Sequence, residues 1–151
     1  MTNGTTTASF TYNGDGIRST KTAKGKTWQY TYDGDKLTHM YDGTRYLHFR
    51  YEGGRPFSFY YNNGTDTRNY YYLWNAQGDC IGITSADGTH LVEYTYDAWG
   101  NITSISGISA NTLALYNPFR YRGYVYDDET GLYYNASRYY NSETIYFAVL
   151  R

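Results

Sequence analysis

Residues 30–38, with the sequence YTYDGDKLT, contain the pattern that decides the fold. Tyr30 and Tyr32 alternate with polar residues, as expected of a β-strand that buries one of its two faces. Asp33 and Gly34 then supply a turn, because Asp hydrogen-bonds to nearby backbone and Gly adopts a positive φ without steric cost. The stretch therefore predicts a strand that ends in a tight hairpin.

The same pattern recurs at the spacing of one hairpin, about twenty residues. It consists of an aromatic residue, any residue, a second aromatic, and a turn residue before a glycine turn; the turn residues are Asn13, Asp33, Glu52, Asn75 and Asp97. Turn dipeptides also recur about every ten residues, at Asn13-Gly14, Lys24-Gly25, Asp33-Gly34, Asp42-Gly43, Gly53-Gly54, Asn63-Gly64, Gln77-Gly78, Asp87-Gly88 and Trp99-Gly100. This spacing predicts an antiparallel β-meander.

The predicted fold class is all-β with little helix. Gly and Thr are frequent, and no stretch keeps a helical period for three turns. A meander of about ten or more hairpin-linked strands would be too wide to remain flat, so we expect a curved strip or a partial barrel. The large share of tyrosine suits such a thin sheet, because its ring covers area while its hydroxyl reaches water or backbone.

Composition excludes several classes of function. The chain has 151 residues, 22 of them tyrosine, and its net charge of −1 gives no long-range attraction to nucleic acid or to an anionic membrane. Cys80 is the single cysteine, so no internal disulfide is expected. No apolar run predicts a membrane span, and the polar start MTNGTTTASF lacks the features of a signal peptide. If the chain is exported, we therefore expect either a signal on a longer parent or an export route that uses no signal peptide.

The repeats resemble the YD repeat of Rhs-type proteins, which include bacterial polymorphic toxins, wall-associated proteins, toxin-complex C subunits and the animal teneurins. Residues 117–147, NPFRYRGYVYDDETGLYYNASRYYNSETIYF, are similar to the Rhs repeat-associated core segment that follows the last repeats. The residues that match this signature are Asn117, Pro118, Phe119, Arg120, Tyr121, Gly123, Tyr124, Asp127, Gly131, Leu132, Tyr133, Tyr134, Arg138, Tyr139 and Tyr140. We therefore predict YD-repeat hairpins over 1–106 and a core segment over 107–151, packed on the same sheet as one structural unit.

The resemblance implies a non-enzymatic fragment of a hollow β-shell, whose bacterial parent encloses and delivers a C-terminal toxin in intercellular competition. The expected partners are the rest of that shell and its cargo, and the expected location is secreted or at the cell surface. In the family, the core usually continues with an Asp-Pro pair, a Gly-Arg-Phe and a second Asp-Pro, where this chain has NSETIYF at 141–147. The aspartates that the resemblance would assign to self-cleavage are absent, so we expect no autoprotease, no toxin activity and no cofactor.

The residues that could carry chemistry have plainer structural interpretations. His39, His48 and His90 lie in no metal-binding motif, which favours ordinary strand or surface histidines over metal or catalytic use. The acidic run 127–129 fits a hairpin turn that ends at Gly131. Cys80 lies in an apolar strand, where a buried inert thiol is the expectation. These patterns predict no catalytic residue and no metal ligand.

The cationic side chains also have a structural explanation. Arg120, Arg122 and Arg138 lie among tyrosines, which favours internal cation–π packing over a nucleic-acid stacking surface. Lys21, Lys24 and Lys26 form a small basic hairpin with Arg18, which we expect to protect an exposed sheet edge.

Two other classes of function remain open. A carbohydrate- or wall-binding module could stack sugar rings on exposed aromatics, and the candidate platforms are Trp28, Trp74 and Trp99. A nuclease is less favoured, because no constellation of acid, base and metal ligand can be assembled.

A strip cut from a shell would also expose edge strands, so a homo-oligomer through such edges is possible, with the apolar segment 145–150 as one candidate.

Overall fold

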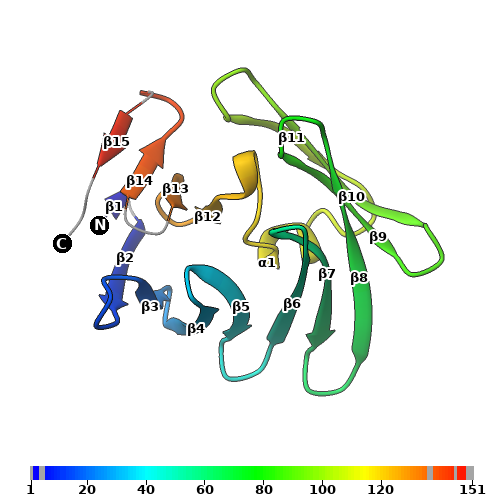
Figure 1. Cartoon of the computed structure of the whole chain (residues 1–151), viewed down its shortest axis with the longest axis horizontal. Helices are drawn as coiled ribbons and strands as arrows, with labels where there is room; N and C mark the ends of the chain where they lie inside the picture. Colours follow the sequence, from blue (N-terminus) through cyan, green and yellow to red (C-terminus); the bar gives the residue numbers. More distant parts are fainter. Residues whose placement is uncertain (1, 4–5, 136–137, 145, 149–151) are drawn as a thin grey trace. The chain divides into compact units, whose positions relative to one another are not determined.

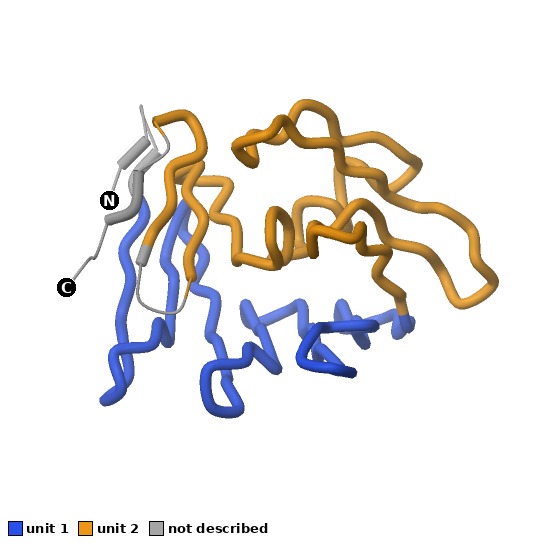
Figure 2. Tube along the Cα trace, turned by 45° about the horizontal axis from the view of Figure 1, so that its top comes forward, with its two compact units in different colours: residues 1–69 blue, residues 70–151 orange. Residues whose placement is uncertain are grey.

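The computed structural model of the chain describes residues 2–3, 6–135, 138–144 and 146–148 (Figure 1). Strands make up 57% of the structure and helix 5%, so the predicted all-β fold with little helix is confirmed. The chain forms two compact units, residues 1–69 and residues 70–151 (Figure 2). In the described part of the chain, no helix is long and apolar enough to cross a membrane.

Unit 1, residues 1–69, is an antiparallel meander in which each strand pairs with its neighbour in the chain. Its strands are β1 (Thr2–Asn3), β2 (Thr6–Tyr12), β3 (Arg18–Ala23), β4 (Lys26–Asp33), β5 (Lys36–Tyr41), β6 (Tyr46–Glu52) and β7 (Arg55–Asn62). Alternate residues are buried, as the strand period requires; Leu37, Met40, Leu47, Phe49 and Phe59 form the apolar core of this unit.

Unit 2, residues 70–151, continues with hairpins and then changes character. Strand β8 (Thr67–Trp74) spans the boundary between the units, and it is followed by β9 (Cys80–Ser85), β10 (His90–Tyr96) and β11 (Ile102–Ser106), which pair in chain order. A second, four-stranded antiparallel sheet comes after two short helices; these elements are α1 (Leu113–Tyr116), η1 (Tyr121–Gly123), β12 (Val125–Asp127), β13 (Leu132–Asn135), β14 (Arg138–Asn141) and β15 (Tyr146–Ala148). Of the apolar segment 145–150, residues 146–148 form β15, and residues 145, 149 and 150 lie outside the described residues.

The glycine turns confirm the predicted meander. Eight of the nine predicted turn dipeptides lie between consecutive strands, and in the ninth Asp33 is the last residue of β4 and Gly34 begins the turn. At Gly53-Gly54 both residues have positive φ, 61° and 80°, which a two-residue hairpin with the right-handed twist of its strands requires. The spacing of the turn signals therefore specified the strand order and the approximate strand lengths.

The turn residue of the repeat acts in two different ways. The side-chain oxygens of Asn13, Asn75 and Asp97 each accept hydrogen bonds from the backbone N–H groups two and four residues later, at 2.8–3.1 Å. Asp33 and Glu52 instead end strands at two-residue turns, where they lie directly opposite Lys36 and Arg55. Side-chain capping is thus confirmed at three positions, and at the other two residues of opposite charge face each other across the turn.

The prediction that Arg18 belongs to an exposed basic edge was wrong. Strand β3 pairs with both β2 and β4, and the side chains of Arg18 and Lys21 are buried. The Arg18 guanidinium lies 4.8 Å from the ring centroid of Phe10 and 5.0 Å from that of Tyr30. Aromatic rings thus accommodate the buried cation, an arrangement that charge counting along the sequence does not reveal.

Candidate functional site

The signature segment, residues 117–140, forms hydrogen bonds that tie it to the hairpins of unit 2. Backbone Cys80 N–H donates to Arg120 O at 3.1 Å, and Arg122 N–H donates to the Asp79 carboxylate at 2.8 Å. Within the segment, Tyr126 N–H donates to Pro118 O at 2.8 Å, which folds residues 118–126 back on themselves. The segment is therefore anchored at the turn between β8 and β9.

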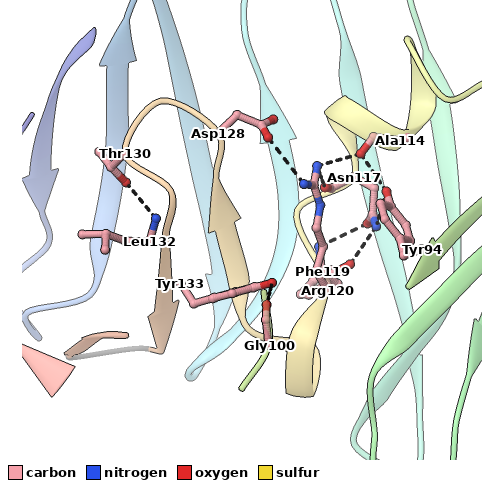
Figure 3. Close-up of polar contacts among 10 residues, drawn as sticks. All are labelled: Tyr94, Gly100, Ala114, Asn117, Phe119, Arg120, Asp128, Thr130, Leu132 and Tyr133. Carbon is pink, nitrogen blue, oxygen red and sulfur yellow. Dashed lines mark hydrogen bonds and ion pairs between the residues drawn. The ribbon is translucent and has the colours of Figure 1, made fainter. Parts of the chain in front are cut away.

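Asn117 is the buried polar centre of this region (Figure 3). Its Oδ1 accepts the hydroxyl of Tyr72 at 2.8 Å, while its Nδ2 donates to Phe119 O at 2.7 Å and to the Tyr94 hydroxyl at 3.2 Å. The Tyr94 hydroxyl in turn donates to Ala114 O at 2.7 Å. Since both ends of the Asn117 amide have partners, its burial is compensated and it links β8, β10 and the signature segment.

Arg120 lies beside Asn117 and is 1% exposed. Its guanidinium donates to Ala114 O at 2.7 Å and to Asn117 O at 3.4 Å, and it forms an ion pair with Asp128 at 3.4 Å (Figure 3). Since the Asp128 side chain is 45% exposed, the backbone carbonyls are the better shielded partners of this buried charge. Arg120 thus stabilises the end of α1 and the turn that follows β12.

The rings around Arg120 support the predicted cation–π packing. The guanidinium carbon lies 5.2 Å from the ring centroid of Tyr94 and 4.8 Å from that of Tyr126. Arg122 is exposed, and its guanidinium lies over the ring of Tyr121 at 5.1 Å. The side chain of Arg138 lies outside the described residues. Internal cation–π packing is thus confirmed for Arg120, whereas Arg122 packs on Tyr121 at an exposed position.

Tyrosine hydroxyls of the four-stranded sheet β12–β15 donate to backbone carbonyls in the turn between β10 and β11. Tyr133 donates to Gly100 O at 2.8 Å and Tyr140 donates to Trp99 O at 2.7 Å, while Tyr96 donates to Cys80 O at 2.5 Å. The rings of Tyr121, Tyr133 and Tyr140 pack together in a buried cluster. The tyrosines therefore act as apolar core residues and as hydrogen-bond donors at the same time.

Most of the signature residues are buried within unit 2. The buried members beyond Asn117 and Arg120 are Pro118, Phe119, Tyr121, Asp127, Tyr133, Tyr134, Tyr139 and Tyr140, while Tyr124 and Leu132 are half-buried. Gly123 and Gly131 have positive φ, and Gly131 ends the turn 128–131 that the acidic run predicted. Sequence reasoning did not identify Tyr72, Tyr94 and Asp79 as partners of this segment, because their pairing depends on contacts far apart along the chain.

The other candidate residues differ in exposure and in chemistry. Of the predicted sugar platforms, Trp28 and Trp74 are half-buried and Trp99 is 53% exposed. Cys80 is buried, and desolvation raises the pKa of its thiol to about 12, so it is a poor nucleophile. Within the described ranges, no group of three or more His, Cys, Asp or Glu side chains could hold a metal ion.

The buried hydroxyls predict a loss of stability at alkaline pH. Burial raises the pKa of Tyr94, Tyr96 and Tyr133 above the ordinary tyrosine value, because a phenolate would lose its hydration there. The neutral hydroxyls also donate to backbone carbonyls, which a phenolate cannot do. Since the unfolded state ionises first, this stabilisation is complete below about pH 10 and decreases as the pH rises above it. We expect the urea midpoint, followed by circular dichroism, to fall between about pH 10 and pH 11.

A matched variant tests whether the buried hydroxyls cause the loss of stability at alkaline pH. Tyr133→Phe keeps the ring but has no hydroxyl to donate to Gly100 O, so its midpoint should be lower at neutral pH and depend less on alkaline pH. A midpoint that stays constant through this pH range in the wild-type chain would contradict the assignment of these hydroxyls as donors.

Comparison with known proteins agrees with the sequence resemblance. The profile of the family described as RHS Repeat matches residues 74–110, which include β9, β10 and β11. The chain is 39% identical over 137 residues to the tRNA3(Ser)-specific nuclease WapA of Bacillus spizizenii, and 38% identical over 140 residues to the tRNA nuclease WapA of Bacillus subtilis. Each match covers 88% of this chain but only 6% of the relative.

Solved structures share the fold at lower identity. A crystal structure of TcdB2-TccC3-TEV matches with a TM-score of 0.66 at 21% identity, over 89% of this chain and 7% of that chain. The Tc holotoxin pore of Photorhabdus luminescens matches with a TM-score of 0.65 at 20% identity, over 94% of this chain and 8% of that chain. At these identities the likeness concerns the fold.

Proposed function

The chain belongs to the Rhs/YD-repeat family, and from this membership we propose that it is a non-enzymatic structural part of an Rhs shell. In this proposal the longer parent encloses a C-terminal toxin and delivers it, outside the producing bacterium, in competition between cells. The partners of the chain are then the rest of the shell and the cargo. The fold shared with chains of Tc toxin assemblies supports a shell component of this kind.

One observation carries the proposal: the most distinctive residues of the chain bond to the chain itself. The amide of Asn117, the guanidinium of Arg120 and the hydroxyls of Tyr133 and Tyr140 all have acceptors or donors within unit 2. A catalytic site would direct such groups toward a substrate. Because these groups are buried or partly buried and bond within unit 2, they serve to hold the signature segment in place.

We place the nuclease activity named for the relatives outside the matched part of those proteins. The matched stretch is 6% of their length, which leaves most of each relative to supply a nuclease. The 151-residue chain is accordingly expected to leave tRNA intact, with and without divalent metal. tRNA cleavage that a point substitution in the chain abolishes would refute the non-enzymatic assignment.

Protease protection tests the enclosing role. The reading frame around this segment identifies the parent, in which we expect further YTYD-type repeats upstream and a variable segment downstream. In the purified parent, the C-terminal cargo should resist a protease that degrades the isolated cargo. Arg120→Ala should shorten this protection, because it loosens the signature segment, whereas Arg122→Ala at an exposed position should preserve it. Equal digestion of free and parental cargo would exclude an enclosing shell.

A binding module for wall carbohydrate is the second candidate function, and the exposure of Trp99 favours it. An indole that is 53% exposed in the turn between β10 and β11 can stack against a sugar ring. Glycan arrays and peptidoglycan pull-downs with the wild-type chain and Trp99→Ala decide the matter: binding that disappears in the variant supports the module, and a flat response from the wild-type chain excludes it.

A further inference from the structure

Strands β5 and β6 bring two of the three histidines of the chain face to face. His39 and His48 are directly opposite each other in the ladder of this hairpin. Their ring centroids are 4.2 Å apart and the ring planes differ by 12°, so the imidazoles are stacked. Both side chains are half-buried, and the third histidine, His90, is exposed on β10 in unit 2.

The hydrogen bonds around His39 determine which ring nitrogen carries the proton. The Thr38 hydroxyl donates its single hydrogen to Thr31 O at 3.1 Å. It must therefore accept in its second contact, which joins Thr38 Oγ1 to His39 Nδ1 at 2.8 Å. Nδ1 then bears the hydrogen, and Nε2 of the neutral ring carries an unprotonated lone pair.

A histidine that donates Nδ1–H to an oxygen and leaves Nε2 unprotonated, as His39 does, has the arrangement usual for metal-binding histidines. A ligating imidazole typically donates its other N–H to an oxygen acceptor, which fixes the tautomer and the orientation of the ring. The Thr31–Thr38–His39 chain thus prepares Nε2 as a ligand.

Cross-strand geometry can supply a second ligand. Side chains directly opposite on one face of an antiparallel pair have Cβ atoms about 4.5–5.5 Å apart. The Thr38 bond holds the His39 ring in place, so rotation of the His48 ring about its terminal torsion, which has broad minima, would bring a His48 nitrogen toward an ion bound at His39 Nε2. Imidazole suits copper, zinc and nickel.

We propose that His39 and His48 form a two-histidine binding site for a divalent first-row transition-metal ion, with water completing the coordination. This site is independent of the proposed shell function. No third His, Cys, Asp or Glu joins a metal-binding group in the described residues, so the site is bidentate and open. Affinity should be higher for Cu²⁺ than for Zn²⁺ or Ni²⁺, as the general order of divalent ions requires.

Titration of the 151-residue chain with Zn²⁺, followed by calorimetry, tests the site. We expect saturable binding of one ion. His39→Gln and His48→Gln should each lower the affinity at least about tenfold, and Thr38→Val should lower it by about tenfold, because the acceptor that orients His39 is lost. His90→Gln is the matched control and should bind as the wild-type chain does. Far-UV circular dichroism of each variant reports whether the hairpins are retained.

A second measurement needs no substitution in the site. The wild-type chain has three imidazole Hε1 signals in its proton NMR spectrum, and the signal absent from His90→Gln identifies His90. Zn²⁺ should shift the other two signals together and leave that of His90 in place. The proposal is overturned if the wild-type chain shows no saturable binding, or if the His90 signal shifts together with the others.

Discussion

Arg120→Ala is expected to destabilise unit 2 by about 3–5 kcal/mol. The substitution removes a guanidinium that is 1% exposed and that donates to Ala114 O and Asn117 O, so these buried carbonyls lose a donor. It also removes the cation from between the rings of Tyr94 and Tyr126 and leaves a cavity there. Urea unfolding followed by far-UV circular dichroism gives the free energy of unfolding.

Two control substitutions separate the sources of this effect. Asp128→Asn removes the ion pair of Arg120 but leaves its carbonyl acceptors, and because Asp128 is 45% exposed the loss should stay below about 1 kcal/mol. Arg122→Ala removes a neighbouring exposed arginine that contacts one tyrosine ring, with a loss of similar size. A loss in Asp128→Asn as large as the loss in Arg120→Ala would show that the ion pair dominates and would reject the carbonyl assignment.

The fold was predictable because its information is local. Turn residues such as Asn75 and Asp97 bond to the backbone two and four residues later, so a short stretch of sequence contains both the cause and the result. The length of each turn then sets the register of the hairpin, which is how His39 comes to face His48 across the loop between Tyr41 and Tyr46. Counting outward from that turn would have found the pair.

The partners of the signature segment were not predictable in this way. The hydroxyl of Tyr140 reaches Trp99 O, and that of Tyr72 reaches Asn117, across 41 and 45 residues of sequence. Nothing in the alternation of a strand identifies which buried carbonyl lies above a given ring. The burial of Arg18 against Phe10 and Tyr30 has the same origin, since it depends on side chains from neighbouring strands rather than on the charge of its own hairpin.

Gly107→Ala is expected to destabilise unit 2 by about 3–5 kcal/mol, through the backbone alone. Gly107 lies directly after β11 and has φ +106°; a Cβ there would lie 2.3 Å from Leu91 O and 2.9 Å from Leu91 C. These are backbone atoms of β10, so no side chain can move aside. The same Leu91 O accepts Ser109 N–H at 3.0 Å, so relief of the clash would break the bond that brings the chain toward α1.

Gly88→Ala is the matched control for this substitution. Gly88 also has a positive φ, +86°, but a Cβ there meets nothing within 4 Å, so only the strained backbone contributes, about 1–2 kcal/mol. The difference between the two variants in urea unfolding measures the contact of β10 with the chain entering the signature segment. Amide hydrogen exchange should accelerate at Ser109 in Gly107→Ala and not in Gly88→Ala. An equal loss of unfolding free energy in both variants would mean that residue 107 does not approach the backbone of Leu91. The chain would then run from β11 to α1 along a different path.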